Sequence, residues 1–127
     1  MNRDTRLTLA DLVAKKLQKQ EKKRKTKDYF VPSLEGNVLI EQPEEAIVLK
    51  SMDMMGDGNL TSIVAAYDYL IYNSIAVFRD PELHKEYEII DPIDIVSALL
   101  ELNERFQIGE AITKMSGIED LGNDVKN

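Results

Sequence analysis

Proline and glycine divide this chain into short segments, and their spacing limits the fold more than any other feature of the sequence. Asp80-Pro81-Glu82 and Asp91-Pro92 each place a proline where it suits the first turn of a helix. Gly56-Asp57-Gly58-Asn59 stops a helix, and Gly117 suits the position just after one. We therefore expect a mainly α fold of five or six short helices.

The helices after residue 42 are predicted from these signals and from apolar spacing. Pro43 suits the first turn of a helix that Ala46 to Met55 continue. The central core helix follows, with an apolar face made of Leu60, Ile63, Val64, Tyr67, Leu70, Ile71 and Ile75. A short helix runs from Asp80-Pro81 to about Tyr87. The helix after Asp91-Pro92 carries Ile93, Val96, Leu99, Leu100 and Phe106, and Gly109-Glu110 begins or interrupts a last helix, 111–116.

A change of period between residues 28 and 42 predicts a small β-hairpin at about 29–41. Tyr29-Phe30-Val31 and Val38-Leu39-Ile40 are β-branched or aromatic runs. Gly36 lies between them and can supply the positive φ of a turn. Pro32 cannot donate to a β-ladder, so it marks an edge or a bulge.

The N-terminal segment predicts an amphipathic helix. Thr8 suits the N-cap, because its hydroxyl can accept from the backbone N–H near Asp11, and Asp11 favours the positive helix N-terminus. One helical face then carries the apolar side chains Leu9, Leu12, Val13 and Leu17. From Lys19 to Lys27 the segment is polar all round, so it is expected to order only with support from a partner.

Charge is divided unevenly along the chain. Residues 1–27 hold ten basic and three acidic residues, a net charge of +7, whereas residues 28–127 carry −14. Such a split indicates a charged arm with its own partner. We therefore predict a basic N-terminal arm or helix at 1–27, one globular domain at 28–121 that is a compact bundle of short helices after the hairpin, and a flexible tail at 122–127.

Three interpretations remain for the lysine-rich run Lys19–Lys27. The first is a solvated helix end, the second is docking onto an acidic partner or onto the acidic body of the same protein, and the third is nucleic acid. Nucleic acid ranks last because the rest of the molecule is acidic and would repel a polyanion. The run also lacks nearby aromatic residues before Tyr29 and Phe30.

The sequence predicts no catalytic residue, no cofactor and no metal site. The chain has no cysteine and a single histidine, His84, expected as a solvated surface residue on a short helix. Asp53, Asp57 and Asn59 do not meet the spacing of a calcium loop and are interpreted as a helix–turn–helix connection. No phosphate-binding, dinucleotide-binding or hydrolase motif occurs.

Membrane and secretory features are also not predicted. The longest mainly apolar stretch, Leu60 to Phe78, is interrupted by Asp68 and Asn73. The first residues lack the apolar region of a secretory signal. Together with the absence of cysteine, this favours a cytoplasmic protein.

Methionines cluster beside the glycine-rich turn at 56–59. Helical spacing puts Met52 and Met55 on one face and Met54 elsewhere, and methionine-rich surfaces adapt to varied apolar partners. The more common role of such residues is filling gaps in a core. As a hypothesis, an exposed Met54 belongs to a partner-binding groove, and the complete candidate set is Leu9, Leu12, Val13, Lys16, Leu17, Lys19, Lys23 and Met54.

An ordered set of segments resembles the XkdN-like tail assembly chaperones of PBSX-type prophages and related contractile-tailed phages. The set spans roughly residues 8–127, and its N-terminal block is the most specific part. It comprises Thr8 to Lys19, Tyr29 to Gly36, Asp80-Pro81-Glu82-Leu83 with Glu86-Tyr87, Asp91 to Val96, and Gly109-Glu110-Ala111-Ile112 leading to Met115-Ser116-Gly117.

The resemblance implies a helical, non-enzymatic chaperone that binds the tape measure protein and keeps it soluble until tail tube subunits polymerise around it. The tail tube protein is a second expected partner. Such proteins act in the bacterial host cytoplasm and are absent from the finished virion. The alternative is a small nucleic-acid-associated or regulatory protein that uses the lysine-rich arm, and the oligomeric state stays open.

The chain's final residues carry a separate gene-level hypothesis. Chaperone genes of this class often make a longer product by ribosomal frameshifting, and Val125-Lys126-Asn127 can be encoded by a slippery run. The gene sequence tests this hypothesis, because frameshifting requires both a slippery seven-nucleotide run at these codons and an open −1 reading frame beyond it.

Overall fold

The computed structural model describes residues 6–21 and 24–117 of the chain. These residues form six α-helices, three 3-10 helices (η) and one two-stranded antiparallel hairpin, which confirms the predicted fold class. The elements are α1 (Leu9–Glu21), β1 (Thr26–Val31), η1 (Pro32–Leu34), β2 (Gly36–Glu41), α2 (Glu45–Met54), α3 (Leu60–Ser74), η2 (Ala76–Arg79), α4 (Pro81–Glu86), η3 (Pro92–Asp94), α5 (Ile95–Leu99) and α6 (Leu102–Met115). The predicted tail, 122–127, lies outside the described residues.

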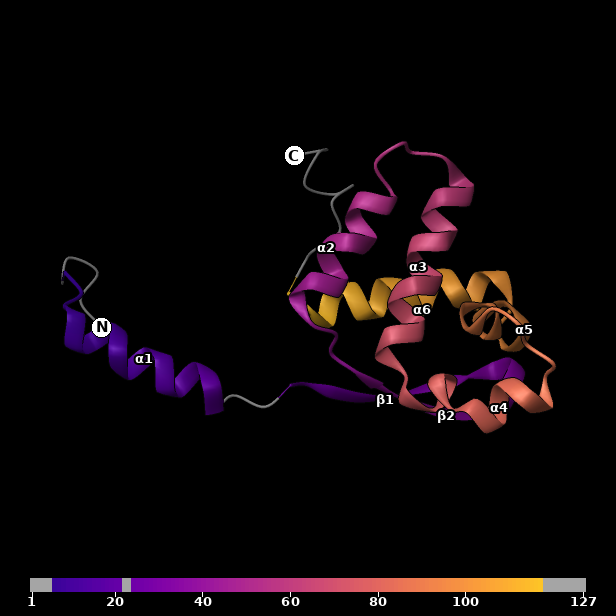
Figure 1. The fold of residues 1–127 in the computed structure, drawn as a ribbon, viewed down its shortest axis with the longest axis horizontal. Coiled ribbons are helices and arrows are strands. Elements are labelled where there is room, and N and C mark those ends of the chain that lie inside the picture. Colours follow the sequence, from indigo (N-terminus) through magenta and orange to yellow (C-terminus); the bar gives the residue numbers. More distant parts are fainter. Residues whose placement is uncertain (1–5, 22–23, 118–127) are drawn as a thin grey trace.

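The helices after the hairpin form a body, and α1 stands apart from it. Helices α2, α3 and α6 lie on one side of the hairpin, which runs along the lower edge of the body in Figure 1. The short helices α4 and α5 lie at the end of the body remote from α1. The predicted arrangement of a basic N-terminal helix followed by a bundle of short helices is therefore present.

The hairpin differs from its prediction at the start and in the turn. It begins at Thr26, which lies opposite Glu41, rather than at about residue 29. Pro32 opens the 3-10 helix that joins the strands, so it marks neither an edge nor a bulge. Glu35, not Gly36, supplies the positive φ, at 53°, and its N–H donates to the Pro32 carbonyl at 3.1 Å. The fixed φ of Pro32 suits the first position of this short helix. One residue in the left-handed region, Glu35, then reverses the direction of the chain into β2.

Several predicted helix ends are confirmed by their hydrogen bonds. The Asp80 carboxylate accepts from the Glu82 N–H at 2.9 Å, directly before α4. Asp91 accepts from the Ile93 N–H at 3.4 Å, before η3. Gly117 follows α6 with a φ of 82°, as the C′ position requires. Pro43 instead precedes α2, which begins at Glu45.

The last two helices contradict the sequence prediction. The chain breaks between α5 and α6, because Glu101 and Glu104 form a reciprocal capping box that starts a new helix at Leu102. Gly109 neither begins nor interrupts a helix but lies inside α6. A Cβ at Gly109 would lie 2.3 Å from Cδ1 of Tyr67. Glycine is therefore required there by the close packing of α3 on α6.

Helix α3 is at the centre of the core, as predicted. Its face contributes Leu70 and Ile71, while Leu60 at its start is 65% exposed. Asp68 of α3 forms a bidentate ion pair with Arg105 of α6, with Nε to Oδ1 at 2.8 Å. The buried core cluster is Val31, Val38, Ile40, Val48, Leu70, Ile71, Ile75, Phe78, Ile95, Val96, Leu100, Ile108 and Ile112.

Candidate partner-binding site

Helix α1 is started by a local capping arrangement that needs no tertiary contact. The Asp11 N–H donates to Oγ1 of Thr8 at 3.3 Å, while the Thr8 N–H and hydroxyl both donate to Oδ2 of Asp11 at 2.9 Å. The backbone N–H of Thr8, followed by its hydroxyl, lowers the pKa of Asp11. The predicted N-cap at Thr8 is confirmed, so the first turn of α1 forms from its own residues.

The apolar face of α1 is exposed rather than packed on the body. Leu9 is 79% exposed, Leu12 53% and Val13 54%. These three side chains share one face by their i, i+3, i+4 spacing. The sequence left open whether this face packs onto the body, and the structure shows that it does not. Leu17 also lies in α1, and Lys23 lies outside the described residues.

The same face continues into exposed lysines towards the end of the helix. Lys16 follows Leu9, Leu12 and Val13 by seven, four and three residues, and Lys19 follows Lys16 by three. Both lysines are exposed. The face of α1 therefore begins with Leu9, Leu12 and Val13 and carries exposed lysines before and after Leu17 towards its end, which suits an apolar partner surface with acidic groups on one side.

The chain between α1 and the hairpin is held by backbone pairing that extends the β-ladder. The Gln42 N–H donates to the Lys25 carbonyl at 2.8 Å, and the Lys25 N–H donates to the Gln42 side chain at 3.2 Å. Arg24 also pairs with Glu44 at 2.9 Å, although both side chains are largely exposed. Helix α1 lies beyond the open end of the hairpin (Figure 1).

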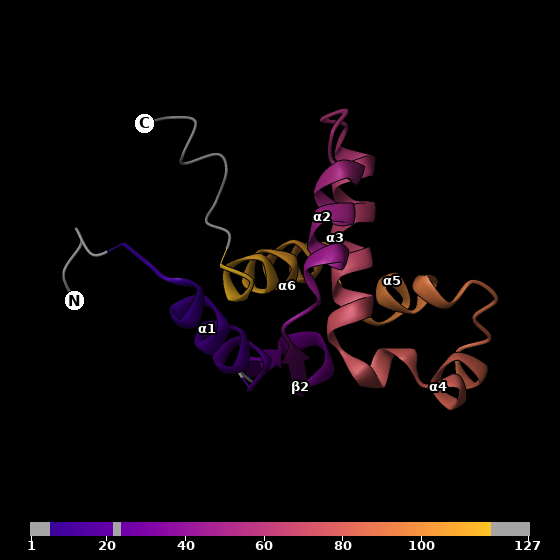
Figure 2. The ribbon, with the colours of Figure 1, turned by 60° about the vertical axis from the view of Figure 1, so that its left-hand side comes forward.

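Met54 is not brought together with the arm. It is the last residue of α2, at the turn into α3, which lies remote from α1 in both views (Figures 1 and 2). Met52, Met54 and Met55 are all half-buried, and Met52 packs against the core cluster. The structure thus places Leu9, Leu12, Val13, Lys16, Leu17 and Lys19 on α1 and Met54 on α2.

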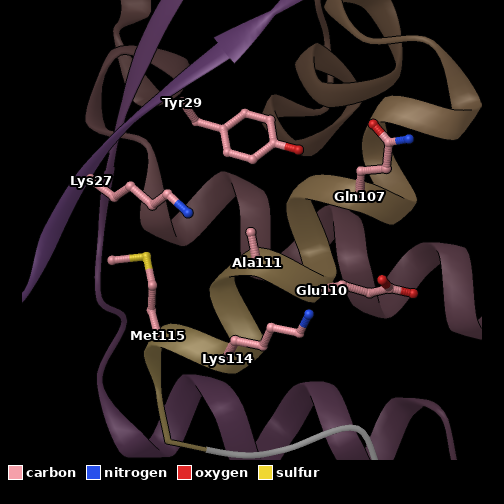
Figure 3. A pocket seen from close by; sticks show the side chains of 7 residues that line it. All are labelled: Lys27, Tyr29, Gln107, Glu110, Ala111, Lys114 and Met115. Atoms are coloured by element: carbon pink, nitrogen blue, oxygen red, sulfur yellow. The ribbon is translucent and has the colours of Figure 1, made fainter.

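A groove that the sequence analysis missed lies between β1 and α6. It has a volume of about 510 Å³ and is lined by Lys27, Tyr29, Gln107, Glu110, Ala111, Lys114 and Met115 (Figure 3). The lysines and Tyr29 converge on it from two elements far apart in sequence. No local motif could have identified it, since only the packing of α6 beside the hairpin brings these residues together.

His84 is not the solvated residue that the sequence predicted. Its side chain is half-buried, Nε2 lies 2.7 Å from the Phe78 carbonyl oxygen, and the ring stacks on Tyr72 with centroids 6.3 Å apart. Because a carbonyl oxygen only accepts, Nε2 must carry a proton and donate. The histidine therefore holds α4 against η2 and α3, which is a structural role.

The aspartate-rich turn is a helix connection, as predicted. Oδ1 of Asp57 accepts from the Asn59 N–H and Oδ2 from the Ser62 hydroxyl, both at 2.9 Å. The Asn59 N–H, followed by the Ser62 hydroxyl, lowers the pKa of Asp57. Within residues 6–21 and 24–117, no group of three histidine, cysteine or acidic residues is placed to hold a metal ion.

Comparisons of the chain with protein-family models, with curated proteins and with solved structures found no match. In the part of the chain that the structure describes, no helix is both long enough and apolar enough to span a membrane. The site is therefore interpreted from its own residues. What they form is an amphipathic helix, held away from a folded body, whose apolar face is exposed.

Proposed function

We propose that this protein is a non-enzymatic tail assembly chaperone of a tailed phage, which binds the tape measure protein through α1 and keeps it soluble. The observation that carries the proposal is the exposure of Leu9, Leu12 and Val13 on a helix held away from the body. An apolar helical face of this kind suits helix-in-groove or helix-on-helix recognition of a protein partner.

The physical cost of leaving this helix unsupported favours a bound state. Helix α1 has 13 residues, and isolated helices of this length are marginal in water because most helical stability in proteins comes from packing. Burying a leucine or valine side chain contributes about 1.5–3 kcal/mol. A partner that covers Leu9, Leu12 and Val13 would therefore stabilise the helix and gain affinity at the same time.

The choice of the tape measure protein rests on the sequence resemblance to XkdN-like chaperones. A tape measure protein is long and aggregation-prone until the tube covers it. Residues 28–127 carry a net charge of −14, so a chain bound through α1 would add solubilising negative charge to that client. The tail tube protein is the second proposed partner, and the proposed place of action is the bacterial host cytoplasm, before the virion is complete.

Nucleic acid binding by the arm is the competing proposal. Exposed Lys15, Lys16 and Lys19 can neutralise phosphates, and such binding would weaken steeply with salt. Phosphate contacts would leave the exposed apolar side chains of the same face without a role. The arrangement of α1 therefore favours a protein partner.

Co-expression with the tape measure protein of the same phage genome tests the proposal. We expect the wild-type chain to raise the soluble fraction of that protein and to co-purify with it, and Leu12→Asp to abolish both effects. Ala14→Asp is the matched control, because it adds the same charge to the opposite side of α1. Equal results for the two variants, or no co-purification of the wild type, would reject the proposal.

A further inference from the structure

The face of the hairpin that points away from the helices carries exposed apolar side chains. This outer face consists of Thr26, Asp28, Phe30, Asn37, Leu39 and Glu41. Phe30 is 58% exposed and Leu39 47%, while the side chains that alternate with them along the strands, Val31, Val38 and Ile40, are buried. Helices α2, α3 and α6 all lie on the other side of the hairpin (Figure 1). The hairpin of this protein therefore has one apolar surface that the helices cover and one that they leave exposed.

The residues of the outer face change in character from the turn to the open end of the hairpin. Phe30 lies opposite Asn37 near the turn, and Leu39 lies opposite Asp28. Glu41 lies opposite Thr26 at the open end. Asp28 and Glu41 are both exposed. From the turn to the open end, the outer face thus passes from Phe30, through Leu39 paired with Asp28, to Glu41.

The face of α1 has the complementary order over a matching length. Leu9, Leu12 and Val13 come first, and Lys16 and Lys19 follow, on either side of Leu17 in the sequence. Leu12 and Lys19 are separated by roughly 10 Å along a helix. Phe30 and Asp28 are about 7 Å apart along a strand, and Thr26, opposite Glu41, is about 7 Å further on. An α1 laid along the hairpin can therefore cover the apolar end and meet the acidic end with lysines.

We propose that the outer face of the hairpin is a docking site for α1 of a second copy of this chain. In that arrangement Leu9, Leu12 and Val13 of one copy cover Phe30 and Leu39 of the other. The second copy and the client proposed above therefore compete for the same face of α1. Lys16 and Lys19 lie beside Asp28 and Glu41. Two such contacts, related by a two-fold axis, form an arm-exchanged dimer in which each chain supplies one arm and one hairpin.

The direction in which the arm leaves the body favours a second copy over the chain's own hairpin. Pairing between Lys25 and Gln42 continues the β-ladder beyond Thr26, and α1 lies beyond the open end of the hairpin that follows it (Figure 1). The net charges also favour contact between an arm and a body, since residues 1–27 carry +7 and residues 28–127 carry −14. The arm of one copy is therefore attracted to the body of another, and this attraction weakens with salt.

Sedimentation of the full chain over a range of concentrations tests the dimer. We expect a monomer–dimer equilibrium whose dissociation constant rises with salt. Leu39→Asp and Leu12→Asp should each raise it by at least about tenfold. The matched controls Leu49→Asp and Ala14→Asp, at exposed positions outside the two faces, should leave it unchanged. A wild type that stays monomeric at every concentration would overturn the proposal. So would control variants whose dissociation constant rises as much as that of Leu39→Asp and Leu12→Asp.

Cysteine cross-linking distinguishes exchange from folding back. The chain has no cysteine of its own, so one Lys16→Cys copy mixed with one Asp28→Cys copy can form a disulfide across this contact only between molecules. We expect a covalent dimer from this mixture under oxidation, and none when Ala14→Cys replaces Lys16→Cys. A Lys16→Cys, Asp28→Cys double variant that closes its disulfide within the monomer, with no dimer from the mixture, would contradict arm exchange.

Discussion

Glu104 is a buried carboxylate that joins two parts of the body. It is 4% exposed, and its oxygens accept from the Ser33 hydroxyl at 2.6 Å, the Ser33 N–H at 3.0 Å and the Glu101 N–H at 2.9 Å. Burial alone would raise the pKa of Glu104, but the Ser33 hydroxyl and the two N–H donors outweigh burial and lower it. One side chain therefore fixes the hairpin turn to the start of α6.

Replacing this carboxylate should destabilise the body. Glu104→Gln puts an amide group among three donors, so at least one donor loses its acceptor. We expect the free energy of unfolding to fall by about 1–3 kcal/mol. Urea denaturation measures this, with Glu110→Gln as the control, since that carboxylate is exposed on the same helix. Equal midpoints for the two variants would show that Glu104 does not join the turn to α6.

The loss of stability caused by Glu104→Gln should depend on pH in a direction that the pKa of Glu104 determines. Because the pKa of Glu104 is lowered on folding, its charged form stabilises the native state above the ordinary value of 4.5, and this contribution is lost as pH falls through the folded pKa. We expect the stability difference between wild type and Glu104→Gln to narrow from pH 7 to pH 3. Denaturation curves at both pH values measure it, and a difference that widens in acid would contradict the assignment.

Gly109 is the second residue whose effect can be predicted from a single contact. Alanine favours a helix over glycine by up to about 1 kcal/mol. In α6 the added Cβ would instead meet Tyr67, with Cδ1 at 2.3 Å and Cβ at 3.0 Å. We expect Gly109→Ala to lower the free energy of unfolding by about 1–3 kcal/mol. If Gly109→Ala instead raised the free energy of unfolding, α3 and α6 could not pack as closely as the 2.3 Å contact with Tyr67 requires.

At the scale of the element, α1 and the body should respond independently to mutation. Thr8→Ala removes the hydroxyl that accepts from the Asp11 N–H and should weaken helix formation by about 1 kcal/mol. We expect the α1 chemical shifts in NMR spectra to move towards coil while the urea midpoint of the body is unchanged, measured at concentrations where the chain is monomeric. A lower midpoint would show that α1 supports the body.

The elements also show which features a sequence can predict. Asp80, Asp91 and Thr8 act on neighbours within three residues, so their caps could be predicted from spacing. The break before α6 and the helical position of Gly109 could not. The capping box before α6 is local but starts from Glu101, which is not one of the usual N-cap residues, and Gly109 is fixed by Tyr67, which is distant in sequence.

At the scale of the whole molecule, the division between arm and body was predictable and the surfaces were not. Charge and apolar spacing predict a basic, amphipathic helix within residues 1–27, but neither indicates whether its apolar face is covered. The outer face with Phe30 and Leu39 follows from strand register, and the groove beside Tyr29 follows from the packing of α6. Such surfaces combine segments that are distant in sequence, and no local sequence pattern predicts how those segments lie relative to one another.

The central claim, that α1 is the element that binds the client, is tested most directly by hydrogen–deuterium exchange. Amides of residues 9–21 should exchange quickly in the monomeric chain, because the helix has little packing to protect it. In the complex with the tape measure protein, we predict strong protection of these amides and little change across α3 and α6. Protection confined to the body, with α1 exchanging as before, would contradict the claim.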